Sequence, residues 1–131
     1  MNMKQPIYAK QIETDLLKEA YFQLSEYFKG SRKEFDLPLN PSGSDFQQTV
    51  WSELLSIPYG ETRSYKEIAE AIGKPDSSRA VGNANNKNPI PIIIPCHRVI
   101  ASGGKLTGYS GGADIKQKLL NIENTIIMSV V

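Results

Sequence analysis

The sequence predicts a mainly α fold, a small helical domain with a winged-helix-like helix-turn-helix and a minor β hairpin. Three observations carry this prediction. Apolar residues recur at helical spacing in several segments, two Ser-x-x-Gln/Glu capping boxes mark helix starts, and stretches with strand-like alternation are short. With 131 residues, of which 40% are hydrophobic and 22% charged, the chain suits one globular domain or one domain with a small appendage.

The N-terminal part of the chain predicts one helix followed by a connector. Residues 12–28 carry apolar side chains at steps of four, and Gly30 ends the pattern. Residues 34–39 alternate polar and apolar side chains until Pro41 and Gly43 interrupt the alternation. We therefore expect a single amphipathic helix with a short extended segment after it.

Two capping boxes predict the next two helices. Ser44-x-x-Gln47 precedes helically spaced apolar residues and predicts a helix over about residues 45–56. Ser64-x-x-Glu67 opens a second helix of about ten residues, with Gly73 as its stop signal.

A third helix follows after a brief turn at residues 74–76. Either Ser77 or Ser78 can cap this helix, which reaches about Asn86. Two short helices on either side of a brief turn have the spacing of a helix-turn-helix. Because many small helical domains contain such pairs, the spacing alone leaves the assignment open.

The segment that leads to the only cysteine changes character. Residues 88–95 contain three prolines, which exclude a helix, and we expect a rigid extended loop that is buried through its isoleucines. The loop delivers Cys96-His97-Arg98 at its end. Residues 99–101 and 105–109 then predict a small hairpin, and a last helix ends near Glu123.

Charge is distributed unevenly along the chain, although the net charge is only +1. Residues 77–113 contain no acidic residue and four basic ones, Arg79, Lys87, Arg98 and Lys105, so this stretch carries +4 and the remainder −3. A segment of one sign can present a local surface for a polyanion. A chance gap in the distribution of acidic residues remains the alternative.

Several classes of protein are disfavoured. The longest apolar run is far shorter than the roughly 18 residues that span a bilayer, and the N-terminus lacks the pattern of a secretory signal, so we expect a cytoplasmic protein without membrane contact. A single cysteine excludes an intrachain disulfide. One cysteine and one histidine cannot supply the side chains that a zinc site normally needs, so we expect no metal.

Cys96 is the candidate nucleophile. A lone cysteine is most often a small buried hydrophobe, but this one follows a proline-stiffened segment and adjoins the only histidine and an arginine, surroundings that favour the thiolate. Cys96 and His97 can bond directly only if the backbone turns sharply; otherwise a water must carry the proton.

Asp114 and Glu123 are the acidic candidates to orient the imidazole of His97. An acid in the last turn of a helix opposes the helix dipole, so Glu123 indicates a partner elsewhere, or else a solvated surface residue.

Arg79 is placed unfavourably in the first turn of its predicted helix, because a cation there opposes the helix dipole. The reason for a cation at this position can therefore lie outside the helix. The neighbouring residues Ala80, Gly82 and Ala84 are small, and Gly82 costs the helix about 1 kcal/mol relative to alanine. Small side chains permit the close approach of a bulky partner such as a nucleic acid, or else tight packing against another helix.

One hexapeptide, Ile94-Pro95-Cys96-His97-Arg98-Val99, resembles the active-site signature of O6-alkylguanine-DNA alkyltransferases, also called methylated-DNA–protein-cysteine methyltransferases. The resemblance covers about residues 15–123. Further motifs match the family in order and spacing: Phe46-Gln47-x-x-Val50-Trp51, Ile57-Pro58-Tyr59-Gly60-Glu61-Thr62-x-Ser64-Tyr65, Arg79-Ala80-Val81-Gly82, Asn88-Pro89 and Gly108-Tyr109-Ser110-Gly111-Gly112.

The resemblance implies DNA repair by direct, stoichiometric transfer of an alkyl group, methyl above all, from O6-alkylguanine in duplex DNA to Cys96. O4-alkylthymine is a possible second substrate. Such a single-turnover methyltransferase flips the damaged base out of the duplex, needs no cofactor and no metal, and acts as a monomer on double-stranded DNA.

The resemblance also implies catalytic roles for individual residues. Cys96 accepts the alkyl group and is activated through a water to His97, with Glu123 as the third member. Asn88 braces the turn around the nucleophile. Tyr65 protonates the departing guanine or crowds the phosphate beside the flipped nucleotide.

Further residues are implied in binding. Arg79 fills the place that the flipped base leaves, on a DNA-binding surface that includes Ser78, Ala80, Gly82, Asn83 and Tyr65. The substrate pocket is lined by Val99, Tyr109, Ser110 and Cys96, and the backbone at Cys96 and Val99 reads the exocyclic amine of the base.

The chain departs from the family pattern at its N-terminus, where relatives carry a sheet-containing domain. We expect residues 1–43 to be a remnant helix and connector, residues 44–124 the DNA-binding alkyltransferase domain, and residues 125–131 a C-terminal tail. Two alternatives are a module that binds lesions or plain DNA without transfer and, with little support from the sequence, a cysteine-dependent hydrolase.

Overall fold

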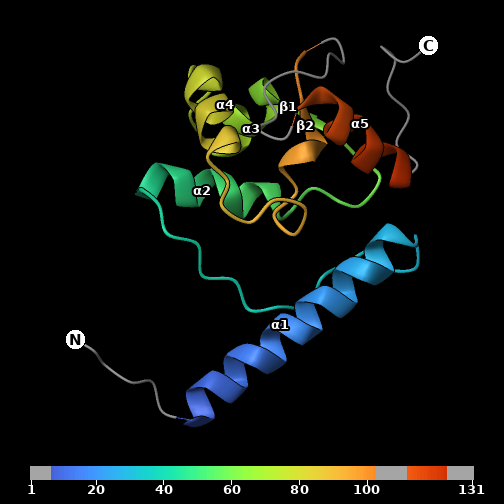
Figure 1. Ribbon diagram of the computed structural model, residues 1–131. Coiled ribbons are helices and arrows are strands. Elements are labelled where there is room, and N and C mark those ends of the chain that lie inside the picture. Colours follow the sequence, from blue (N-terminus) through green and yellow to red (C-terminus); the bar gives the residue numbers. More distant parts are fainter. Residues whose placement is uncertain (1–6, 103–111, 124–131) are drawn as a thin grey trace. The chain divides into compact units, whose positions relative to one another are not determined.

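The computed structural model describes residues 7–102 and 112–123 (Figure 1). The described residues are mainly helical, as the sequence predicts. In chain order the elements are α1 (Ile7–Phe28), α2 (Asp45–Leu54), β1 (Arg63–Ser64), α3 (Tyr65–Ala71), α4 (Ser78–Asn86), the 3-10 helix η1 (Cys96–Arg98), β2 (Val99–Ile100) and α5 (Ala113–Ile122). The chain divides into two compact units, residues 1–39 and 40–131. None of the described helices is both long and apolar enough to cross a membrane.

The first unit consists of α1 and the connector, which lies along it. The helix begins at Ile7, earlier than predicted, and ends at Phe28 before Gly30, as predicted. The buried amide of Gln23 donates to the carbonyl of Asp36 at 3.1 Å and accepts from its N–H at 2.9 Å. The ring of Tyr27 packs on Phe35 with a centroid distance of 5.5 Å. Gln23 and Tyr27, which lie four residues apart on one face of α1, therefore hold the connector at Asp36 and Phe35.

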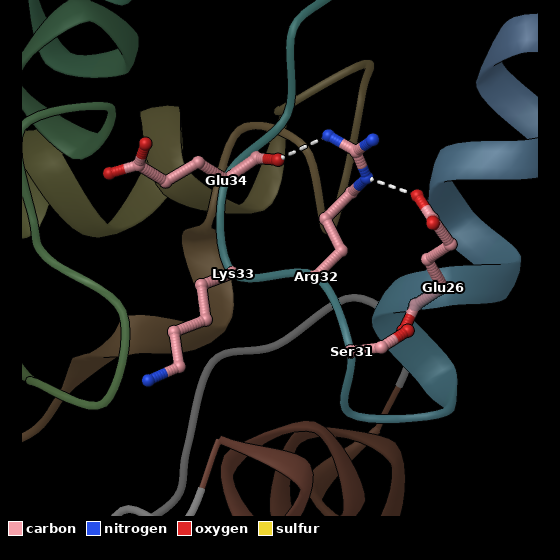
Figure 2. Close-up of a pocket in the computed structure, with 5 residues that line it drawn as sticks. All are labelled: Glu26, Ser31, Arg32, Lys33 and Glu34. Atoms are coloured by element: carbon pink, nitrogen blue, oxygen red, sulfur yellow. Dashed lines mark hydrogen bonds and ion pairs between the residues drawn. The ribbon is translucent and has the colours of Figure 1, made fainter.

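This unit has a pocket of about 460 Å³, lined by Glu26, Ser31, Arg32, Lys33 and Glu34, whose side chains are drawn in Figure 2. Arg32 donates to the Glu26 carboxylate at 2.8 Å and to the carbonyl of Glu34 at 2.9 Å, which ties the connector to the end of α1. None of the residues predicted to act in catalysis or binding lines this pocket.

Both predicted capping boxes are present in the second unit. The Ser44 hydroxyl accepts from the N–H of Gln47 at 3.1 Å, and the Gln47 side chain accepts from the N–H of Ser44 at 2.9 Å. Ser64 and Glu67 form the same pair at 3.0 and 2.8 Å. These boxes satisfy backbone donors that α2 and α3 would otherwise leave open. Both helices end a little earlier than the sequence predicts.

The helices α2, α3 and α4 pack on one another and form the core, with α3 and α4 side by side (Figure 1). The largest core side chains here are almost fully buried: Val50, Trp51, Leu54, Ile68 and Val81. The indole of Trp51 donates to the carbonyl of Ala84 at 2.8 Å, so α2 holds α4 by a directed bond as well as by packing. The helix pair α3 and α4, joined by residues 72–77, agrees with the predicted helix-turn-helix.

The start of α4 differs from the prediction in one detail. Ser77 is the residue before the helix, but its hydroxyl donates to the carbonyl of Lys74 at 2.7 Å and gives α4 no side-chain cap. Ser78 is already the first residue of the helix. The first turn therefore begins without a side-chain acceptor and carries the cation of Arg79.

The prediction of an extended segment at residues 88–95 is wrong. The chain turns back on itself, with a bridge between Pro91 and Ile94 and a left-handed backbone at Ile92, where φ is 74°. The side chain of Asn88 closes this turn, because it donates to the carbonyl of Ile94 at 2.8 Å and accepts from the N–H of Ile90 at 2.9 Å. Of the isoleucines, only Ile94 is fully buried.

The observed strand pairing is not the predicted hairpin. Strand β2 pairs in parallel with β1, with Arg63 opposite Val99 and Ser64 opposite Ile100. The second arm of the predicted hairpin, residues 105–109, lies outside the described residues. A strand of two residues such as β1 is too short to produce an alternating pattern, so it could not be predicted from the sequence. The last helix, α5, ends before Glu123 as predicted.

Candidate active site

The backbone turns sharply at Cys96. Residues Cys96–Arg98 form one turn of 3-10 helix, in which the N–H of Cys96 donates to the carbonyl of Ile94 at 2.8 Å and that of Arg98 to Pro95 at 3.0 Å. Adjacent side chains therefore do not point to opposite sides as they would in a strand. The cysteine itself is 2% exposed.

Glu123 reaches this turn from the end of α5, and its carboxylate meets two side chains of the turn. His97 Nε2 lies 2.6 Å from Oε2 of Glu123. Arg98 donates from Nε to Oε1 at 2.9 Å and from Nη2 to Oε2 at 3.0 Å. Glu123 is 2% exposed, whereas Asp114 is exposed. Of the two acidic candidates, Glu123 is the one against His97, and the alternative of a solvated surface residue is excluded.

The loop after α2 completes the surroundings of Glu123. The N–H of Gly60 donates to Oε1 at 3.4 Å, and Arg98 donates from Nη1 to the carbonyl of Ile57 at 2.7 Å. Gly60 has a φ of 82°, and a Cβ there would lie 3.3 Å from the carbonyl oxygen of Glu123. A left-handed turn this close to another backbone favours glycine.

His97 is fully buried, and its pKa lies below the ordinary value of 6.5. Burial is the main cause; the hydrogen bond and the charge of Glu123 raise the pKa, and the cations of Arg98 and Lys116 lower it. The imidazole is therefore neutral at neutral pH. With Nε2 donating to Glu123, the proton sits on Nε2 and Nδ1 carries the lone pair.

Tyr65, at the start of α3, lies against the neighbouring helix α4. Its pKa is raised, first by burial and then by the negative charge that Cys96 carries as a thiolate. A Cβ at Gly82 of α4 would lie 3.8 Å from the ring of Tyr65, an ordinary van der Waals distance. Packing inside the chain therefore does not require a glycine at this position.

Two asparagines of the α4 region hold the backbone around the nucleophile. Asn88 fixes the carbonyl of Ile94, as the predicted bracing role requires. Asn85, which is 1% exposed, donates to the carbonyl of Cys96 at 3.3 Å. The sequence analysis missed Asn85, although a polar residue next to buried Ala84 on the inner side of a helix is a recognisable signal.

Lys116 of α5 was also missed. Its side chain is completely buried, and its ammonium donates to the carbonyl of Val99. Burial lowers its pKa from 10.5 to about 8, while the thiolate of Cys96 acts in the opposite direction. Lys116 lies three and four residues before the buried Leu119 and Leu120, so its position on the apolar side of α5 could have revealed it.

The outer face of α4 carries the predicted DNA-contacting residues. Arg79, Ala80 and Asn83 are exposed, Ser78 and Gly82 are half-buried, and Val81 and Ala84 face the core. No residue of α4 is acidic. A pocket of about 260 Å³ lies between the start of α2 and α4, lined by Ser44, Phe46, Gln47, Ala80, Asn83, Ala84 and Lys87.

The predicted substrate pocket is only partly described. Val99 is fully buried next to the turn, and Cys96 lies three residues before it. Tyr109 and Ser110 lie outside the described residues. Within the described ranges, no group of three or more His, Cys, Asp or Glu side chains could hold a metal ion.

These groups define a class of site. A buried thiol adjoins a neutral histidine that a carboxylate orients. The outer face of α4, a helix without acidic residues, lies on the same unit. Such an arrangement suits a cysteine nucleophile whose substrate is brought by a polyanion.

Comparison with known proteins supports this class. Residues 45–125 match the family model "6-O-methylguanine DNA methyltransferase, DNA binding domain". A methylated-DNA–protein-cysteine methyltransferase of Methanosarcina barkeri is 64% identical over 106 residues, which cover 81% of this chain and 67% of the relative. The crystal structure of Mycobacterium tuberculosis OGT in complex with DNA is 59% identical with a TM-score of 0.80, over 81% of this chain and 66% of that one.

A more distant likeness is to Schizosaccharomyces pombe Atl1 in complex with damaged DNA containing O6-carboxymethylguanine, 30% identical with a TM-score of 0.56 over 64% of this chain and 80% of that one. The chain belongs to the O6-alkylguanine-DNA alkyltransferase family of DNA-repair methyltransferases and carries the family's DNA-binding domain. It spans about two thirds of the length of the Methanosarcina and Mycobacterium relatives.

The buried ammonium of Lys116 predicts a pH-dependent stability. Because the folded chain binds this proton more weakly than the unfolded chain, the free energy of unfolding should rise as the pH increases from about 8 to 10.5. Below pH 8 the cost is fully present, and a lowering of the pKa from 10.5 to about 8 corresponds to roughly 3 kcal/mol. Urea unfolding across this range should show that the difference between the unchanged chain and Lys116→Met shrinks as the pH rises. The exposed Lys118→Met is the control, and a difference that is constant with pH would contradict the assignment.

Proposed function

We propose that this chain, by itself, transfers an alkyl group from O6-alkylguanine in duplex DNA to the sulfur of Cys96. The observation that carries the proposal is the placement of Cys96 in a sharp turn beside a neutral His97 that a buried Glu123 orients. O4-alkylthymine is the second substrate of the proposal. The chain acts as a cytoplasmic monomer, with residues 44–124 as the acting domain.

The reaction is a displacement at the alkyl carbon. The thiol proton passes to His97, directly or through a water, and the thiolate attacks the alkyl carbon while the bond from that carbon to O6 breaks. The guanine takes the electron pair and is protonated as it leaves, and Cys96 becomes a thioether. A thioether resists hydrolysis, so each chain reacts once and needs no cofactor.

Tyr65 is the proposed proton donor to the leaving base. A phenol whose pKa is raised stays protonated at neutral pH, and the charge of Cys96 is one of the causes that raise it. Asn88 and Asn85 hold the carbonyls of Ile94 and Cys96, so the turn keeps its shape when the thiol becomes an anion. Val99, Tyr109 and Ser110 are proposed to line the pocket for the flipped base.

The outer face of α4 is the proposed DNA contact. Arg79 is exposed at the start of the helix and is proposed to fill the place of the flipped base. Ser78, Ala80, Gly82 and Asn83 would lie against the duplex, and none of them carries a negative charge. The named likenesses to proteins crystallised with DNA support a nucleic-acid partner of this kind.

A second candidate is a module that binds lesions without transfer. Its support is the likeness to Atl1, whose structure contains damaged DNA. The thiol in its polar turn favours transfer over this alternative.

The two candidates differ in the mass of one peptide. Incubation with a duplex that contains O6-methylguanine should add one methyl mass per chain, located on the tryptic peptide with Cys96, and Cys96→Ser should remain unmodified. A gel shift on the same samples measures binding. Binding without added mass would select the second candidate and contradict transfer.

Gly82→Ala separates stability from DNA binding. Since a Cβ fits against Tyr65 at 3.8 Å, the variant should fold, with a free energy of unfolding higher by about 0.4–1 kcal/mol. Its affinity for duplex DNA should fall by roughly tenfold, about 1.4 kcal/mol, because the methyl group keeps the helix from the duplex. Ser52→Ala, an exposed position on α2, serves as the control. An unchanged affinity of Gly82→Ala would remove the close approach from the account.

A further inference from the structure

Arg98 has no assigned part in the reaction, although it binds both oxygens of the Glu123 carboxylate. It donates to both carboxylate oxygens, at 2.9 and 3.0 Å, and its remaining terminal nitrogen donates to the carbonyl of Ile57. Its guanidinium lies 5.7 Å from the ring centroid of Tyr59. At 7% exposure it is a buried cation in a fixed geometry, held from three directions.

Arg98 and His97 share one carboxylate oxygen. Oε2 of Glu123 accepts from Arg98 Nη2 at 3.0 Å and lies 2.6 Å from His97 Nε2. One carboxylate carries one negative charge, and the bidentate guanidinium balances it permanently, because arginine does not lose its proton in proteins. The guanidinium therefore offsets part of the effect that this carboxylate has on the histidine, in the same direction as burial.

The charges around His97 come from every element packed against it. Lys116 faces His97 from α5, and Glu123 from the residue after that helix. Arg98 and Cys96 belong to the same turn as His97, and Tyr59 lies next to Arg98 and Glu123. Among them Glu123 favours the imidazolium, whereas Arg98 and, less strongly, Lys116 oppose it. Without Arg98, a buried anion 2.6 Å away would act on His97 with a single distant cation against it.

We propose that Arg98 is a positioning residue that holds both oxygens of Glu123 and thereby keeps His97 as a neutral imidazole, with its proton on Nε2 and its lone pair on Nδ1. This inference rests on the proposed function, in which His97 accepts the thiol proton of Cys96. Only a neutral imidazole can accept this proton. When Nδ1 takes the proton from the sulfur, His97 becomes an imidazolium, which the carboxylate of Glu123 stabilises.

The chain has one histidine, so nitrogen-15 labelling of histidine gives one pair of ring signals that report both its protonation and its tautomer. In the unchanged full-length chain, NMR titration should show the neutral Nε2–H tautomer at pH 6.5 and above. Arg98→Met should raise the titration midpoint by about one pH unit or more, because the charge of Glu123 is then uncompensated. Arg98→Lys keeps a cation and should stay within about half a unit of the unchanged chain.

Two controls rank the effect. Lys116→Met should raise the midpoint less than Arg98→Met, since its ammonium opposes protonation less strongly. Arg63→Met removes an exposed arginine paired with Glu61 and should leave the midpoint where it is. If Arg98→Met does not fold, the same substitution is made in the Lys116→Met background and compared with Lys116→Met alone.

An unchanged midpoint in Arg98→Met, or in the double variant relative to Lys116→Met alone, would overturn the inference. The titration does not require alkyl transfer, so the inference about Arg98 can be refuted without refuting the proposed function. A raised midpoint with no alkylation of Cys96 would support the role of Arg98 in setting the histidine and contradict the proposed reaction. Alkylation of Cys96 with a midpoint that Arg98→Met does not move would leave the reaction standing and remove Arg98 from it.

Discussion

The carboxylate of Glu123 is the contact on which the geometry of the site depends. It joins the end of α5 to the turn at Cys96–Arg98 and to the loop at Gly60, three segments that are far apart in the sequence. A buried carboxylate is costly unless charged and hydrogen-bonding partners surround it. Here Arg98 and His97 satisfy it from the segment that carries the nucleophile, so the same bonds that make its burial tolerable also fix the turn.

A second set of bonds connects the nucleophile to the proposed DNA-contacting helix. Trp51 holds the carbonyl of Ala84, and the next residue, Asn85, holds the carbonyl of Cys96. Asn88, just beyond α4, holds the carbonyl of Ile94. The inner side of α4 therefore positions the turn while its outer side stays exposed. A duplex seated on that face would be in fixed register with the sulfur, which is what a reaction on a flipped base requires.

The sequence predicted most of the helices because their signals are local. The capping boxes at Ser44 and Ser64 act within four residues, and both are present. The strand β1 and the fold of residues 88–95 could not be predicted, since the first depends on pairing with Val99 and the second on the side chain of Asn88. Prolines exclude a helix but do not distinguish an extended segment from a turn.

The candidate site was predicted unevenly for the same reason. The motif around Cys96 drew attention to His97, and the unfavourable place of Glu123 at a helix end indicated a partner elsewhere. Arg98 also binds this carboxylate, but the contact depends on long-range packing that no spacing rule describes. Lys116 was missed because a lysine is expected at the surface, and its burial shows only when α5 is placed.

The central claim is that the buried Glu123 carboxylate organises this unit, and the free energy of unfolding of Glu123→Gln tests it most directly. Glutamine keeps the size of the side chain and removes the charge, which leaves the Arg98 cation buried without its counterion. Urea unfolding at neutral pH should show a loss of about 3–5 kcal/mol relative to the unchanged chain, with the exposed Glu61→Gln as the matched control. A loss of less than about 1 kcal/mol, the range of an ordinary surface pair, would contradict the account.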